Sequence, residues 1–151
     1  GRVLARPIAA TRAQPPFPAS AMDGYAVPAD AAHPGAQFQV IGRSVAGRGF
    51  DGAVGAGQAV RIFTGGVVPD GANHVVIQED VTRDGDAITI NEASEQPRHI
   101  RAAGIDFHEG DVLAESGDAL NEIHGALFAA ANIPEVLVYR RPRVAIAGVR
   151  K

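Results

Sequence analysis

Short segments of aliphatic side chains recur along the middle of the chain. Residues 37–41 alternate polar and apolar side chains, which is typical of a half-buried strand. Further short apolar segments occupy residues 58–63, 75–77 and 87–90. Asp84-Gly85-Asp86 is typical of a hairpin turn between the last two of these segments. The pattern predicts a small barrel or a strongly coiled sheet over residues 37–91.

A different period appears nearer the C-terminus. The apolar positions follow the i, i+3, i+4, i+7, i+8, i+11 spacing of one helix face, at Leu120, Ile123, His124, Leu127, Phe128 and Ala131. This spacing predicts a helix over residues 119–131, with Asp118 as its N-cap and Asn132 as the left-handed residue that ends it. We expect His124 to pack rather than to bind a metal. Residues 136–139 and 144–147 are predicted strands.

Composition narrows the class of protein. The 151 residues suffice for one domain or two small ones, and 18 glycines with 10 prolines favour many turns. The net charge of −3 argues against a nucleic-acid partner, and no apolar run is long enough to cross a membrane. The chain has no cysteine, which excludes disulfides and thiolate sites and fits a cytoplasmic location.

Two segments carry most of the candidate chemistry. A proline-rich stretch at residues 15–18 leads into Ser-Ala-Met-Asp-Gly-Tyr-Ala-Val at residues 20–27. Gly24 allows a turn or a close backbone approach directly after Asp23. Thr64 and the glycines Gly65 and Gly66 follow a predicted strand, where backbone amides and a hydroxyl suit an oxyanion.

A glycine-rich stretch follows the first predicted strand. Residues 47–52 match Gly-x-Gly-x-x-Gly, a spacing found in dinucleotide-binding loops. No helical pattern follows it, so hairpin turns and bulges are favoured over a nucleotide site.

Three motif blocks, in order, resemble the molybdopterin molybdenumtransferases, the family of MoeA and the gephyrin E domain. They are the Ser-Ala-Met-Asp-Gly-Tyr run, the block from Arg61 to Val76 that contains Thr-Gly-Gly and Pro-Asp-Gly-Ala, and the block at residues 100–107. The sequence departs from the family pattern at four positions: Gly66 replaces Ala, Asn73 replaces Asp, His99 replaces Asn, and Ile105 replaces Glu.

The resemblance implies an α+β fold, mostly β with one clear helix. It implies a discontinuous elongated dimerisation unit from residues 1–18 and 107–142, and a coiled, barrel-like β insert from residues 19–106. Residues 143–151 would begin a molybdopterin-binding domain that the chain does not complete.

The resemblance also implies an activity and a site. The family inserts molybdenum from molybdate into adenylylated molybdopterin, assisted by Mg²⁺, in a cleft between the two subunits of a homodimer. Carried over to the matching motifs, Asp23, Thr64 and Asp106 are catalytic, with Asp23 and Asp106 as metal ligands. The expected substrate-binding residues are Ser20, Gly65, Gly66 and Arg101.

Two alternatives remain beside the enzyme. Ile105 in place of the family glutamate favours a non-catalytic binding or dimerisation module with the same fold. A generic nucleotide binder rests only on residues 47–52. On the enzyme reading, the 151-residue chain alone is expected to be inactive.

Overall fold

The structure is a computed structural model and describes residues 1–92 and 98–148. The described residues form mostly strands and turns with one α-helix, which confirms the predicted α+β class. They divide into two compact units, one from Pro15–Asp106 and one from Gly1–Gln14 with the chain after Phe107. The N-terminal segment of the smaller unit was predicted to end at residue 18, whereas in the structure it ends four residues earlier, at Gln14. None of the described helices is long and apolar enough to cross a membrane.

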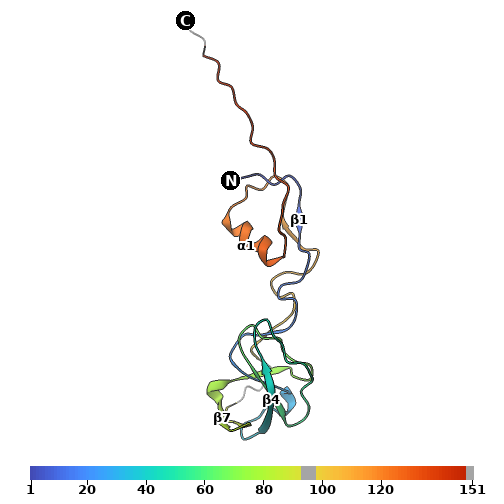
Figure 1. The fold of residues 1–151 in the computed structure, drawn as a ribbon, viewed down its shortest axis with the longest axis vertical. Helices are drawn as coiled ribbons and strands as arrows, with labels where there is room; N and C mark the ends of the chain where they lie inside the picture. Colours follow the sequence, from blue (N-terminus) through green and yellow to red (C-terminus); the bar gives the residue numbers. More distant parts are fainter. Residues whose placement is uncertain (93–97, 149–151) are drawn as a thin grey trace. The chain divides into compact units, whose positions relative to one another are not determined.

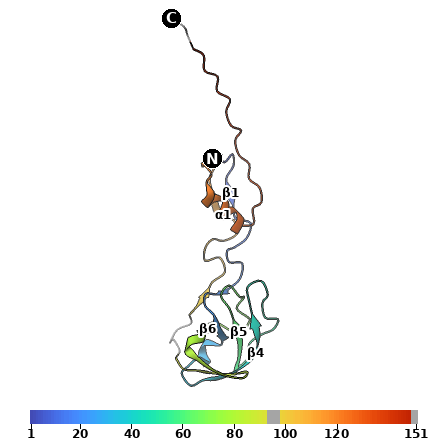
Figure 2. The ribbon, with the colours of Figure 1, turned by 60° about the vertical axis from the view of Figure 1, so that its left-hand side comes forward.

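The larger unit is built on a six-stranded curled sheet with the order β6-β3-β5-β4-β8-β7 (Figure 1 and Figure 2). Its strands are β3 (Gly24–Val27), β4 (Gln37–Ser44), β5 (Gln58–Ile62), β6 (His74–Ile77), β7 (Val81–Asp84) and β8 (Ala87–Ile90). All neighbouring pairs are antiparallel except β4 and β5, which run parallel. Short 3₁₀ turns at Ala29–Ala31 and Gln78–Asp80 link the strands. A separate two-stranded ladder pairs β2 (Ala19–Ser20) with β9 (Ile100–Arg101).

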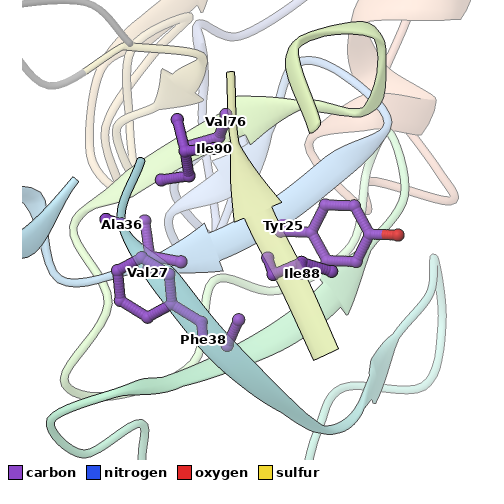
Figure 3. Packing of buried hydrophobic residues seen from close by; sticks show 8 residues of the cluster. Tyr25, Val27, Ala36, Phe38, Val76, Ile88 and Ile90 are labelled. Atoms are coloured by element: carbon purple, nitrogen blue, oxygen red, sulfur yellow. The ribbon is translucent and has the colours of Figure 1, made fainter. Parts of the chain in front are cut away.

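Strand β3 is buried on both faces. Tyr25 and Val27 join a core cluster with Phe38, Val76 and Ile88 (Figure 3), whereas Ala26 faces a second cluster. Residues in β3 therefore alternate between two cores, as the two-residue period of a strand requires. Strand β3 begins directly after Asp23, so this buried strand holds the backbone next to the carboxylate.

Two roles were predicted for Gly24, a turn or a close approach of the backbone to another group, and its surroundings distinguish them. A Cβ at Gly24 would lie 2.0 Å from the carbonyl oxygen of Val76. The residue pairs with Ile62 on one side and Ile77 on the other. Glycine is thus required here because two strands approach β3 closely, not because the chain turns.

The predicted hairpin turn at residues 84–86 is present, but the first of the two strands that it joins is not the expected one. Gly85 has φ 59° and joins β8 to β7, a strand that the sequence analysis missed. Strand β6 instead pairs with β3. The pairing of 75–77 with 87–90 was therefore wrong, because the intervening residues 81–84 form a strand of their own.

The glycine-rich stretch forms turns and a bulge, as favoured from the sequence. The register of β4 shifts between Val40 and Gly42, and Val45 bridges Arg48 through a turn at Gly47, whose φ is 80°. The next strand, β5, follows this stretch. The Gly-x-Gly-x-x-Gly match thus lacks the helix that a dinucleotide site needs.

The smaller unit contains β1 (Ile8–Ala9), β10 (Val112–Ala114) and α1 (Glu122–Ala130). Strands β1 and β10 pair antiparallel, and Figure 1 labels β1 beside α1. Leu4, Ala114 and Phe128 form one small core, and Ala10, Phe107 and Ala131 form another. Helix α1 therefore contributes the largest aromatic side chain of the first core.

Helix α1 begins later than predicted. Asn121, not Asp118, is the N-cap, and it forms a capping box with His124. Asp118 instead accepts the backbone N–H of Glu115 at 2.8 Å. The predicted left-handed residue Asn132 is confirmed by its φ of 58°. The expected apolar stripe was wrong at Ile123, whose side chain is 75% exposed.

The prediction of two C-terminal strands, at residues 136–139 and 144–147, was also wrong. Residues 136–139 form only a bridge between Val138 and Leu4, flanked by backbone hydrogen bonds. Val144 and Ile146 are 80% and 94% exposed and belong to no strand. Residues 149–151 of the expected third-domain segment lie outside the described residues, as do residues 93–97 of the predicted loop.

Candidate functional site

The structure brings Asp23 and Thr64 together at one edge of the sheet. Asp23 precedes β3 and Thr64 follows β5, and these two strands are antiparallel neighbours. Asp23 Oδ1 accepts two hydrogen bonds from Thr64, from the backbone N–H at 2.8 Å and from the hydroxyl at 3.0 Å. Two residues that are far apart in the chain thus form one polar pair.

The Thr64 hydrogen bonds favour the ionised form of Asp23. The backbone N–H and then the hydroxyl of Thr64 lower the pKa of Asp23. Desolvation raises it by a smaller amount, and the positive charge of Arg61 has the smallest lowering effect. No described hydrogen bond engages Oδ2. The carboxylate therefore presents one oriented, negatively charged oxygen for a ligand.

Arg61 is held rigidly beside this pair. Its guanidinium lies 5.0 Å from the centre of the Tyr25 ring and 4.7 Å from that of Phe63. It donates to the carbonyl of Gly24 at 3.0 Å and to the side chain of Gln78. Because Arg61 is already ordered, it can balance negative charge without losing further rotamer freedom.

Gln78 belongs to this cluster although it was not among the residues predicted from the sequence. Its backbone N–H donates to the carbonyl of Asp23 at 3.1 Å, and its side chain also contacts Glu79 at 3.1 Å. Only the pairing of β6 with β3 places it there. A lone glutamine after a short strand carries no signal that could have found it.

Ser20 has a structural role in this arrangement. Its hydroxyl donates to the carbonyl of Met22 at 2.6 Å and accepts the N–H of the same residue at 3.3 Å. The residue is only 2% exposed. Ser20 therefore shapes the turn that presents Asp23, and its buried hydroxyl is not open to a substrate.

The glycine amides are also engaged within the fold. Gly65 N–H donates to the carbonyl of Ser20 at 2.9 Å, and Gly66 N–H donates to that of Phe63 at 2.8 Å. The geometry therefore gives no support to their expected use as oxyanion donors. A Cβ at Gly66 would lie 2.9 Å from the carbonyl oxygens of Phe63 and Ser44, so this backbone accommodates glycine better than the family alanine.

Asp106 pairs with Arg101. One terminal nitrogen of Arg101 lies 2.7 and 2.8 Å from the two carboxylate oxygens, and both side chains are about half exposed. Strand β9, which carries Arg101, pairs with β2 just before Asp23. Among the described residues, however, no hydrogen bond or ion pair joins Asp106 to Asp23 or Thr64.

The fit to Mg²⁺ is partial but chemically sound. The described residues hold no group of three or more His, Cys, Asp or Glu side chains suited to a metal. Mg²⁺ usually binds one or two carboxylates together with waters and phosphate oxygens, so such a group is not required. Asp23, with Oδ2 free of described hydrogen bonds, is the better candidate, because Arg101 already neutralises Asp106.

Comparisons with known proteins agree with this fold and these motifs. The family model described as "MoeA N-terminal region (domain I and II)" matches residues 1–132. A molybdopterin molybdenumtransferase of Haemophilus influenzae is 37% identical over 146 residues, which cover 96% of this chain and 36% of that protein. One of Nostoc sp. is 36% identical, with 97% and 35% covered.

Solved structures show the same similarity. The crystal structure of the molybdopterin biosynthesis MoeA protein from Pyrococcus horikoshii matches with a TM-score of 0.85 and 34% identity, covering 94% of this chain and 38% of that one. A MoeA protein therefore shares both the curled β unit and the discontinuous unit that carries α1. The chain belongs to the MoeA N-terminal-region family, and it spans about a third of the length of the relatives named above.

Proposed function

We propose that this chain is the N-terminal region of a molybdopterin molybdenumtransferase, and that the complete protein inserts molybdenum from molybdate into adenylylated molybdopterin. Family membership and the names of the relatives support the proposal. The single structural observation that carries it is the Asp23–Thr64 pair, in which an ionised carboxylate is fixed by two hydrogen bonds.

Each charged or polar residue of the site has a separate proposed role. Thr64 orients Asp23 and keeps it ionised, while Arg61 supplies a fixed positive charge beside it. Asp106 and Arg101 form a charged pair that contributes to substrate binding. Mg²⁺, when bound, would neutralise phosphate charge, and Asp23 would hold it. We further propose a cytoplasmic homodimer in which this region completes the site of the partner subunit.

Carboxylate replacement in the complete protein tests this role. Asp23→Asn preserves the shape of the side chain but removes its charge. In cells that depend on this protein for molybdenum cofactor, molybdoenzyme activity should therefore fall by a factor of at least about 100. Asp30→Asn, at an exposed carboxylate of the same unit, is the matched control and should leave activity unchanged. Near-normal activity of Asp23→Asn would refute the proposed role. The isolated 151-residue chain should make no cofactor.

A non-catalytic binding module is the second candidate. It is favoured by Ile105, which stands where the family has glutamate and is 60% exposed, and by the engaged amides of Gly65 and Gly66. Because Ile105 is exposed, Ile105→Glu should fold normally. A large gain in activity would indicate a decayed site, whereas unchanged high activity would show that the glutamate is dispensable.

A further inference from the structure

A basic surface lies on the larger unit and extends from Arg61, beside the candidate site, to two arginines that the proposed activity does not use. A hollow of about 570 Å³ is lined by three arginines, Arg43, Arg61 and Arg83, with Asp86 as its one carboxylate. A neighbouring hollow shares Arg43 and adds Arg48 and Asp51. This concentration of positive charge contrasts with the net charge of −3 for the whole chain.

The arginines converge because of the sheet topology. Arg43 on β4 and Arg61 on β5 are register partners in a parallel pair, so their side chains leave the same face of the sheet. Arg83 reaches the same hollow from β7, which lies beyond β8. Like charges directly opposite one another on neighbouring strands destabilise a sheet unless something balances them.

The protein itself balances this charge poorly. Asp86 lies 3.7 Å from Arg83, and their side chains are 75% and 49% exposed, so solvent weakens the pair. Among the described residues, Arg43 has no side-chain hydrogen bond or ion pair. Arg61 is preorganised between Tyr25 and Phe63, and its hydrogen bonds go to the uncharged Gly24 carbonyl and Gln78 side chain. Asp23 is close enough to feel its charge, but among the described residues no ion pair joins the two.

The hollow is lined by apolar as well as charged side chains. Val40, Ile41 and Phe63 line it beside the arginines. Apolar walls lower the local dielectric constant and concentrate the field of the charges. Guanidinium groups also match the oxygens of phosphate-like anions in geometry as well as in charge.

We propose that the hollow formed by Arg43, Arg61 and Arg83 binds a tetrahedral dianionic oxyanion, either free or as the phosphoryl group of a larger molecule. The three arginines come from separate strands, so an anion in the hollow can be approached by positive charge from more than one direction. The hollow shares Arg61 with the proposed transferase site, whereas Arg43 and Arg83 have no part in the proposed activity, so substitutions at Arg43 and Arg83 test the oxyanion site separately.

The test is an NMR titration of the 151-residue chain with inorganic phosphate, at constant ionic strength set with NaCl. Backbone amide and arginine Nε–H resonances of residues 40–43 and 83–86 should shift and saturate. Arg43→Gln should weaken binding about tenfold, the loss expected for one charge-assisted contact. Asp86→Asn should strengthen binding severalfold, because it removes the competing carboxylate.

A charge-matched control separates a site from general attraction. Arg6→Gln removes the same charge from the exposed surface of the smaller unit and should leave the affinity within twofold. Non-saturating shifts, or equal weakening by Arg6→Gln and Arg43→Gln, would overturn the proposal. The backbone spectrum of each variant verifies its fold.

A second titration with phenyl phosphate identifies the source of the oxyanion. Affinity at least tenfold above that of inorganic phosphate, with shifts at Phe63, would indicate the phosphoryl group of a larger molecule. Equal affinity, confined to the arginines, would indicate a free oxyanion. Either result supports the shared chemistry, whereas absence of saturable binding by both compounds refutes it.

Discussion

Gly24→Ala should destabilise the larger unit strongly, because β3 has no room for a side chain at this position. The added Cβ would lie 2.0 Å from the carbonyl oxygen of Val76 and 3.1 Å from Cα of Ile77. An ordinary contact begins near 3.4 Å, so β3 and β6 must separate locally by about 1.4 Å. Both obstacles belong to the backbone, so no side-chain rotation can relieve the contact.

The magnitude follows from what this separation breaks. The Gly24–Ile77 and Tyr25–Val76 pairs lie at the affected end of the β3–β6 ladder. Losing one or two backbone hydrogen bonds, at about 1 kcal/mol each, adds to an overpacking cost of about 1–3 kcal/mol. We therefore expect a loss of about 3 kcal/mol in the free energy of unfolding. For a unit of this size, that loss lowers the melting temperature by roughly 12–24 °C.

Differential scanning calorimetry of the chain measures this shift, and Gly49→Ala in the same unit is the matched control. A Cβ at Gly49 would lie 3.5 Å from the Val67 side chain, an ordinary contact, so its effect should stay below about 0.5 kcal/mol. If the two variants melt at the same temperature, the argument from close strand approach is wrong. Displacement of β3 should also disturb the hydrogen bonds between Asp23 and Thr64, which NMR would detect as a raised pKa of Asp23.

Three further predictions concern single interactions. Asn121→Ala removes the N-cap of α1 and should cost about 1 kcal/mol of stability in urea unfolding; an unchanged midpoint would show that the cap is unimportant. Thr64→Val removes the hydroxyl donor to Asp23, so an NMR titration should show the pKa of Asp23 rising towards its ordinary value, and a constant pKa would contradict the assigned cause. Burial is the main cause that lowers the pKa of His74, and the nearby positive charges of His99 and Arg98 lower it further. The Nδ1 atom of His74 also accepts a hydrogen bond from the backbone N–H of Arg98 at 2.9 Å. The folded state therefore favours neutral His74, whose contribution to stability is complete above the unfolded pKa of about 6.5 and declines as the pH falls through the lowered folded pKa. Urea unfolding between pH 8 and 5 should show this decline, and His74→Gln should flatten it; equal slopes in the two proteins would refute the assignment.

Local signals in the sequence determined most of the regular structure. The segments that became β4, β5, β6 and β8 were visible as short apolar runs, because the period of a strand is a property of neighbouring residues. The turn at Gly85 and the left-handed Asn132 were visible for the same reason. Strand β7 was missed because its side chains are polar and largely exposed, so it has no apolar period.

Competition between local interactions decided the helix boundary. Asp118 and Asn121 are both good N-cap residues, but Asp118 is engaged in a turn with Glu115. Ile123 fits the apolar spacing of the helix yet remains exposed, because spacing reveals which residues share a face and not what packs against that face.

In the candidate site, too, the sequence indicated some features and the tertiary structure decided others. The residue types at Asp23 and Thr64 were visible as motifs in the sequence, and those motifs alone predicted a carboxylate and a hydroxyl as candidate ligand-binding groups. Their contact could not be predicted in this way, because it requires β3 and β5 to be neighbours, and strand order is set by burial of both faces of β3 between two cores. The same tertiary pairing occupies the amides of Gly65 and Gly66 and brings Arg43 beside Arg61. The sequence thus determined which functional groups the chain carries, whereas strand order decided which of them meet and which remain available to a ligand.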